Sequence, residues 1–128
     1  MNFFTKKRAI FFLAAAFLAA ILITLPLCQR CSAYVYWTNF DSNTVARANT
    51  NGTSPNQKWI QGFSGPLSVT VDVQYIYWAN YDENTIGRAH LDGSSPDQNW
   101  ITGCGGPDGV VIDANYIYWT NYDTNTIG

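Results

Sequence analysis

A tandem repeat of 41 residues dominates the sequence after residue 33. The segments 34–74 and 75–115 align without a gap and are identical at 20 of 41 positions. The segment 116–128 then matches the start of the second copy at 11 of 13 positions. Periods near this length are typical of helical solenoids and of propeller blades. The repeat therefore limits the architecture to a few classes before any single residue is considered.

Composition favours the β class. Each copy clusters β-branched and aromatic residues between Asn, Asp and Gly, and no apolar run at helical spacing follows residue 33. This pattern predicts four short strands in each unit. In the best-defined unit we expect them at 69–71, 75–78, 85–89 and around Trp100, with turns at 80–84 and 91–96 and a linker at 105–109. The predicted fold is all-β: about two and a third four-stranded antiparallel blades of an incomplete β-propeller, preceded by an N-terminal apolar helix.

The first 33 residues differ from the rest and predict export. Lys6, Lys7 and Arg8 precede an apolar run at 9–27, and Cys31 and Ala33 are small residues suited to signal peptidase. A cleaved signal peptide is the leading interpretation. An uncleaved membrane anchor at 9–27, with the repeats outside, is the second. A lipoprotein anchored on Cys28 is the third. All three predict a secreted, periplasmic or cell-surface location for the repeats.

Charge and cysteine content exclude several classes of function. Residues 34–128 hold three Lys or Arg residues against nine Asp or Glu residues, a net charge of −6. Such an acidic module is a poor candidate for binding nucleic acid or anionic membrane surfaces, so membrane contact is expected only through the N-terminal segment. Cys104 is the one cysteine after residue 33, which allows neither a disulfide framework nor a zinc site. We expect it to fill a small apolar space where the first copy has Phe63.

The motifs of the unit resemble the YWTD repeat of the low-density-lipoprotein receptor class B family. Tyr-Trp-(Thr/Ala)-Asn occurs three times, and 85–93 and 109–113 resemble the strands that flank the family's signature. The resemblance covers residues 34–128. The repeat-signature residues, which we expect to be structural, are Tyr36, Trp37, Asn39, Tyr77, Trp78, Asn80, Tyr118, Trp119 and Asn121, together with Arg47 and Arg88.

The signature departs from the family in its fourth residue, which is Asn where the family has Asp. The Asp helps tie the family's blades together, so charge pairing with Arg47 or Arg88 is not expected from Asn. The resemblance implies about six blades, so we expect the sequence to be part of a longer protein. The first unit starts at its second strand, and the open strand edges of such a piece predict self-association.

Alternating Asn and Asp residues form the candidate metal site. Asn39, Asp41 and Asn43 provide oxygens at the spacing that Ca²⁺ binding uses, and both later copies repeat the pattern. Hairpin turns built on Asx hydrogen bonds explain the same residues without a metal. Turns are the preferred interpretation, no cofactor is expected, and Ca²⁺ remains the alternative.

Function is predicted only as a class. No Ser/His/Asp set, carboxylate pair or phosphate-binding loop can be assembled, so we expect no catalytic or cofactor-binding residues in this stretch. The preferred hypothesis is a module that binds a protein, peptide or glycan. One alternative is a piece of a propeller enzyme, of the virginiamycin B lyase or lactonase type. The other is a structural protein of the cell surface.

Overall fold

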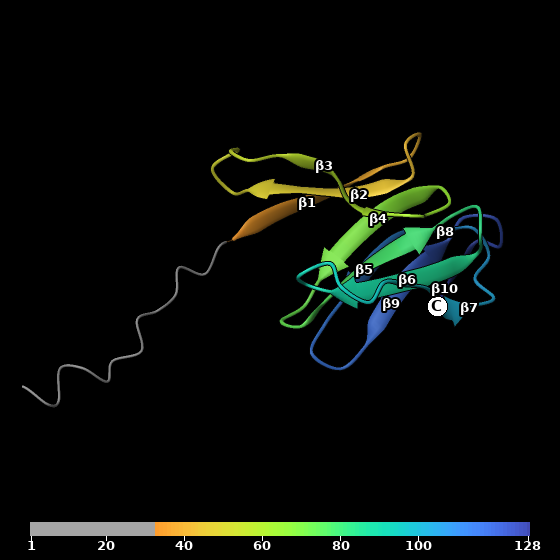
Figure 1. The fold of residues 1–128 in the computed structure, drawn as a ribbon. Helices are drawn as coiled ribbons and strands as arrows, with labels where there is room; N and C mark the ends of the chain where they lie inside the picture. Colours follow the sequence, from red (N-terminus) through yellow and green to blue (C-terminus); the bar gives the residue numbers. More distant parts are fainter. Residues whose placement is uncertain (1–32) are drawn as a thin grey trace, which may run out of the picture. The chain divides into compact units, whose positions relative to one another are not determined.

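Ten β-strands and no helix make up the part of the chain that the computed structural model describes, residues 33–128 (Figure 1). The strands form three antiparallel sheets in which sequence neighbours pair. The predicted apolar helix and export segment lie outside the described residues. Within 33–128 no helix has the length and hydropathy needed to span a bilayer. The all-β prediction is confirmed for this part of the chain.

The second sheet contains all four strands of the predicted unit. Its order is β4-β5-β6-β7, an antiparallel meander. The first sheet, β1-β2-β3, starts at the equivalent of β5, as the repeat alignment predicts. The third sheet has the order β8-β9-β10. The strand bounds are β1 Tyr34–Asn39, β2 Thr44–Asn49, β3 Asn56–Gln61, β4 Pro66–Val71, β5 Tyr75–Asn80, β6 Thr85–His90, β7 Asp97–Thr102, β8 Pro107–Ile112, β9 Ile117–Asn121 and β10 Thr126–Ile127.

The main difference from the predicted strands is their length. Strand β4 begins at Pro66 rather than at Val69, and β8 begins at Pro107, inside the predicted linker. Proline has no N–H group to donate to a neighbouring strand. At the first position of a strand it is tolerated because the later residues still donate their hydrogen bonds. A register shift follows each proline before regular pairing resumes. The linkers that join the sheets are therefore shorter than predicted.

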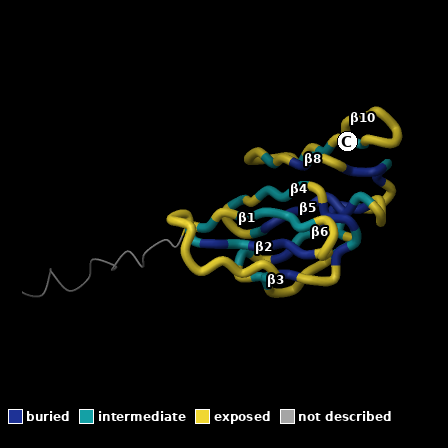
Figure 2. The backbone as a smooth tube through the Cα atoms, turned by 90° about the horizontal axis from the view of Figure 1, so that it is seen from above, coloured by how far each residue is buried: buried dark blue, intermediate teal, exposed yellow. Residues whose placement is uncertain are grey.

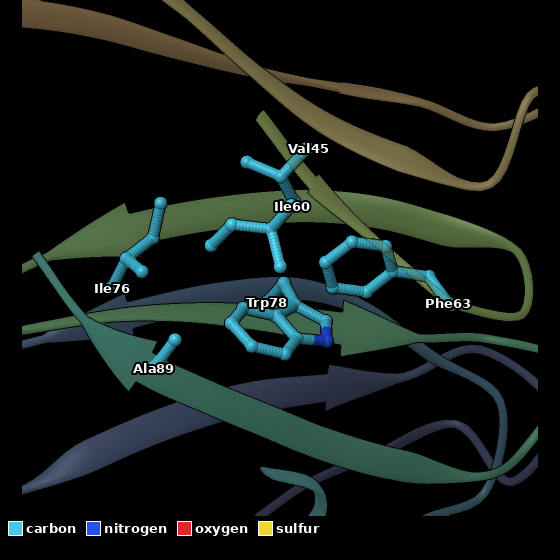
Figure 3. Packing of buried hydrophobic residues seen from close by; sticks show 6 residues of the cluster. All are labelled: Val45, Ile60, Phe63, Ile76, Trp78 and Ala89. Carbon is cyan, nitrogen blue, oxygen red and sulfur yellow. The ribbon is translucent and has the colours of Figure 1, made fainter. Parts of the chain in front are cut away.

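The principal core lies between the first and second sheets. On β5, Ile76 and Trp78 point to the face that meets the first sheet, and both are fully buried. Figure 3 shows Val45 and Ile60 of the first sheet above them, with Phe63 beside the Trp78 indole. The two rings meet edge to face, with centroids 4.7 Å apart. Period-two alternation along β5 thus supplies two of the six buried residues of this core.

A second core lies between the second and third sheets. Ala79, Ile86, Cys104 and Val110 are buried there. Cys104 is a free, buried thiol at the position where the first core has Phe63, and burial raises its pKa. It is therefore the small apolar filler that the repeat alignment predicts.

Strand β4 connects the packing of the three sheets. It contacts β1 of the first sheet and β8 of the third sheet, and β8 also contacts β5. Figure 2 shows buried backbone in β2 and β5, and more exposed backbone in the third sheet and the turns. Repeated antiparallel sheets packed in this order are compatible with a propeller-like repeat.

Candidate binding rim

The signature asparagines of the first two sheets, Asn39 and Asn80, each join three strands of their own sheet. Asn80 Nδ2 donates to Thr85 Oγ1 at 3.1 Å and to the carbonyl oxygen of Gln98 at 3.1 Å. Asn39 Nδ2 makes the equivalent contacts to Thr44 and Gln57. In each sheet the threonine hydroxyl already donates to the same glutamine carbonyl, at 2.7 Å for Thr85 and 2.8 Å for Thr44, so its oxygen accepts from the amide, and a carboxylate could not supply that donor. These hydrogen bonds therefore explain why the fourth signature residue is Asn in this chain.

The signature tryptophans differ in burial although two of them make the same hydrogen bond. Trp78 Nε1 donates to Gln98 Oε1 at 3.1 Å, and Trp37 Nε1 donates to Gln57 Oε1 at 3.2 Å. Trp78 is fully buried, whereas Trp37 is half-buried. In the third sheet Trp119 is half-buried and packs at the edge of the second core. Of the three, only Trp78 is fully enclosed by the packing of its neighbours.

The two signature arginines are held by aromatic rings. The Arg47 guanidinium lies 4.4 Å from the Tyr34 ring centroid and 4.3 Å from that of Trp59. Arg88 lies 4.7 Å and 4.5 Å from the rings of Tyr75 and Trp100. Each guanidinium is therefore in cation–π contact with two aromatic rings.

The signature tyrosines of the second and third copies bond to the aspartates that close β4 and β8. Tyr77 Oη donates to Asp72 Oδ2 at 2.9 Å, and Tyr118 Oη donates to Asp113 Oδ2 at 3.1 Å. Burial and the bond to Asp72 raise the pKa of Tyr77 to about 12. In Tyr36, burial raises the pKa against the opposing effect of Arg47. These pairs stabilise the turns at the end of the sheets opposite the rim described below.

Asp72 makes stability depend on pH. Burial acts to raise the pKa of Asp72, but the N–H groups of Gln74 and Tyr75, which donate to its Oδ1 at 2.7 Å, hold that pKa below its ordinary value. A carboxyl with a lowered folded-state pKa stabilises the fold above its unfolded pKa, and the contribution is lost as pH falls through the folded pKa. We expect the free energy of unfolding to decline below about pH 4. For the variant Asp72→Asn, the free energy of unfolding measured by urea titration should decline less steeply across this pH range. An unchanged dependence on pH would contradict the role assigned to Asp72.

Tyr77 predicts a second loss of stability at high pH. Its folded-state pKa of about 12 exceeds the ordinary value of 10.0, so the neutral phenol is favoured in the fold. This contribution is complete below pH 10 and is lost as pH rises from 10 toward 12. Tyr77→Phe should remove this contribution. Urea titrations at alkaline pH should then show a smaller decrease in the free energy of unfolding between pH 10 and pH 12 than in the unchanged chain.

The other end of the sheets is formed by hairpin turns and by the linkers between sheets. We call it the hairpin rim; it consists of the turns 40–43, 81–84 and 122–125 and the linkers 62–65 and 103–106. Gly65 joins two of these turns: its N–H donates to Asn43 Oδ1 at 3.0 Å, and its carbonyl accepts the Tyr81 N–H at 3.0 Å. Gly106 makes the same bonds to Asn84 and Tyr122. The linker glycines therefore set the spacing between neighbouring hairpins.

Glycine is required at both linker positions. Gly65 and Gly106 have φ values of +60° and +63°, and a Cβ on either would lie 2.6 Å from an aspartate oxygen of the next hairpin. The same Cβ would lie 3.0 Å from the ring of Phe40 or Tyr81. Each hairpin aromatic thus lies directly over the following linker.

These aromatic residues form a groove on the hairpin rim. The groove has a volume of about 320 Å³, and its lining is mostly apolar. Tyr81 lies between two neighbours: its ring centroid is 6.4 Å from that of Tyr122, and its hydroxyl donates to Asp123 Oδ1 at 3.0 Å, which raises the pKa of Tyr81. We call this the aromatic groove; it is lined by Phe40, Leu67, Tyr81, Asp108 and Tyr122.

The hairpin rim is also acidic. Five of the nine acidic residues lie in its turns or at the groove, and none of the three Lys and Arg residues of 33–128 does. The field at the groove is therefore negative and favours positively charged ligands. The five acidic residues are Asp41, Asp82, Glu83, Asp108 and Asp123.

The alternating Asn and Asp residues serve the turns. Asn43, Asn84 and Asn125 adopt positive φ values of 53°, 57° and 53°, which asparagine tolerates. Asn43 and Asn84 use their side-chain oxygens for linker N–H groups, and Asp123 uses one of its oxygens for Tyr81. Among residues 33–128 no group of three or more His, Cys, Asp and Glu side chains is placed to hold a metal ion.

Comparison of the chain with protein-family models gave no match, and no curated protein matches it either.

Sequence reasoning missed the aromatic groove. The signal was present, because position 40 and its equivalents 81 and 122 carry Phe, Tyr and Tyr directly after the signature. A large ring in the middle of an Asn- and Asp-rich turn has no role in the turn itself. Its recurrence at a 41-residue spacing places one ring at the same end of every sheet.

Proposed function

We propose that residues 34–128 are YWTD-like β-propeller repeats on the extracytoplasmic side of a membrane, and that their hairpin rim binds a cationic segment of a partner protein. The single observation that carries the binding proposal is the aromatic groove, an apolar and aromatic surface within an acidic rim. Export is supported by the basic and apolar pattern of residues 6–27.

The propeller assignment is supported by the repeat and by the sheets together. The second sheet is a four-stranded antiparallel meander, and its strand β4 packs against β1 and β8 of its neighbours. The Tyr-Trp-(Thr/Ala)-Asn signature recurs on β1, β5 and β9 in the same register with the following strand. Radial repetition of such sheets is the propeller architecture.

A cationic, partly apolar peptide suits the groove better than a neutral ligand. The exposed rings of Phe40 and Tyr122 offer apolar contact, with exposed fractions of 45% and 69%. Asp108 places a carboxylate among them. Aromatic side chains frequently dominate the energetics of protein interfaces, and acidic surfaces accelerate the approach of basic partners.

The proposal can be tested with the full chain and labelled probe peptides. We expect a short peptide of alternating Lys and Leu to bind in fluorescence anisotropy, with affinity that falls as salt rises. A peptide of alternating Glu and Leu should not bind. Asp108→Leu should weaken binding without a change in fold, since Leu67 occupies the same position in the preceding unit. Equal binding of both peptides, or binding of a neutral oligosaccharide instead, would refute the proposal.

Substitution of Tyr122 is the most direct single-residue test of the groove. Tyr122→Ala should weaken the Lys–Leu peptide by about tenfold, near 1.4 kcal/mol, because one aromatic wall is removed. Tyr116 is the matched control: it is 66% exposed against 69% for Tyr122, and it lies outside the groove. Tyr116→Ala should leave the affinity unchanged. A similar loss in both variants would point to a nonspecific effect of surface tyrosines.

A further inference from the structure

A second cavity, distinct from the aromatic groove, lies between the first linker and the second sheet. Its volume is about 300 Å³, and its lining is mainly polar. Ser64 and Phe63 of the linker line one side, and Asn80, Glu83 and Gln98 of the second sheet line the other. The ring of Phe63 lies beside Trp78 at the edge of the principal core (Figure 3).

An unpartnered oxygen marks this cavity. Asn80 is fully buried, and its Oδ1 has no hydrogen-bond partner, although its Nδ2 is bonded to Thr85 and Gln98. A buried acceptor without a hydrogen-bond partner destabilises the fold. Such an atom beside a polar cavity is a position where a donor from a ligand would be stabilised.

In the third sheet the equivalent oxygen, Asn121 Oδ1, has a hydrogen-bond partner within the chain. There Gly105 occupies the place of Ser64, and its N–H donates to Asn121 Oδ1 at 3.0 Å. A Cβ on Gly105 would lie 2.6 Å from the Thr124 side chain, so only glycine permits this approach. Ser64 carries that Cβ, and Glu83 stands at the position equivalent to Thr124; both residues line the cavity. Where these two replacements occur, the linker N–H does not reach the Asn oxygen and the cavity is present.

The chemistry of the lining selects a cation that donates hydrogen bonds. Glu83 brings a carboxylate, Asn80 a free amide oxygen and Phe63 an aromatic wall, and no Lys, Arg or His lines the cavity. A single water occupies only about 30 Å³ and supplies no charge. A primary ammonium supplies three donors and a positive charge, and aromatic rings attract it.

We propose that this cavity binds a primary ammonium group. The group can belong to a lysine side chain of a partner or to a small free amine, because both present the same donors. The proposal does not depend on the aromatic groove, which shares none of its lining residues with the cavity.

Calorimetric titration of the full chain with n-butylammonium tests the proposal, with n-butanol as the uncharged control. We expect n-butylammonium to bind and n-butanol not to bind. Nα-acetyl-lysine amide, whose only amine is the side-chain ammonium, distinguishes the two sources. If it binds at least as tightly as n-butylammonium, the site suits lysine; if only n-butylammonium binds, the site suits a free amine. Absence of binding by both amines, or equal binding of n-butanol, would overturn the proposal.

Two variants locate the binding. Glu83→Gln should weaken n-butylammonium at least tenfold, whereas Asp41→Asn, the same charge change in the turn of the first sheet, should not. Ser64→Gly should abolish binding because it allows the linker to close on Asn80. In that variant hydrogen exchange at the amide of position 64 should slow, as the N–H acquires Asn80 Oδ1 as its acceptor. Unchanged affinity in both Glu83→Gln and Ser64→Gly would overturn the assignment even if the chain binds amines elsewhere.

Discussion

Trp78→Ala is expected to lower the free energy of unfolding by about 3–5 kcal/mol. Trp78 is fully buried, and its indole packs against Phe63 and the first-sheet residues Val45 and Ile60. Gly87 allows the ring to lie flat on β6, since a Cβ there would clash with the indole. Removing the ring leaves a cavity in the principal core and removes one of the two donors to Gln98 Oε1, the other being Asn80 Nδ2. Urea denaturation followed by far-UV circular dichroism measures the loss.

Trp37→Ala is the matched control for this prediction. Trp37 makes the same hydrogen bond to a glutamine, Gln57, but it is half-buried and faces Ala46 rather than a glycine. The variant should cost less than half as much as Trp78→Ala, because less apolar surface returns to water. Equal losses in the two variants would contradict the position assigned to the principal core.

Asn80→Asp is expected to lower the free energy of unfolding by about 2–4 kcal/mol at neutral pH. The amide nitrogen of Asn80 donates to Thr85 Oγ1 and to the Gln98 carbonyl, and the residue is fully buried. A carboxylate at this position has no hydrogen to donate and would face the Gln98 carbonyl oxygen. The loss should shrink at acid pH, because burial favours the protonated carboxyl, which regains one donor.

The same change at the equivalent position of the first sheet isolates the effect of burial. Asn39 donates to Thr44 and Gln57 as Asn80 does to its partners, but it is only half-buried. Asn39→Asp should therefore cost about 1 kcal/mol or less, since water can solvate the charge. If Asn80→Asp were as mild, the signature Asn would not be required as a donor, and the contacts assigned to it would be wrong.

The sheets follow from the sequence because their determinants are local. Asn and Asp in the turns, alternation along 75–78 and the fixed repeat length together predict the strands and their order. The strand starts at Pro66 and Pro107 were missed because proline normally argues against a strand. Both prolines are fully buried where β4 and β8 begin, and no local pattern in the sequence encodes that burial.

The binding surfaces were not predicted because they depend on contacts between units. The equivalence of Phe40, Tyr81 and Tyr122 is visible in the repeat, but their convergence into a groove requires the spacing set by Gly65 and Gly106. The cavity at Asn80 is subtler still. It arises where Ser64 and Glu83 replace a Gly and Thr pair that packs closely in the next unit. The roles of Arg47 and Arg88 depend likewise on rings from other strands.

Nuclear magnetic resonance titration of the isotope-labelled full chain with the Lys–Leu peptide tests the central claim most directly. If the hairpin rim is the binding surface, amide shifts should change for the groove residues Phe40, Leu67, Tyr81, Asp108 and Tyr122, and Asp72 and Asp113 at the opposite end of the sheets should be unaffected. Shift changes confined to that opposite end, or none at saturating peptide, would contradict the account.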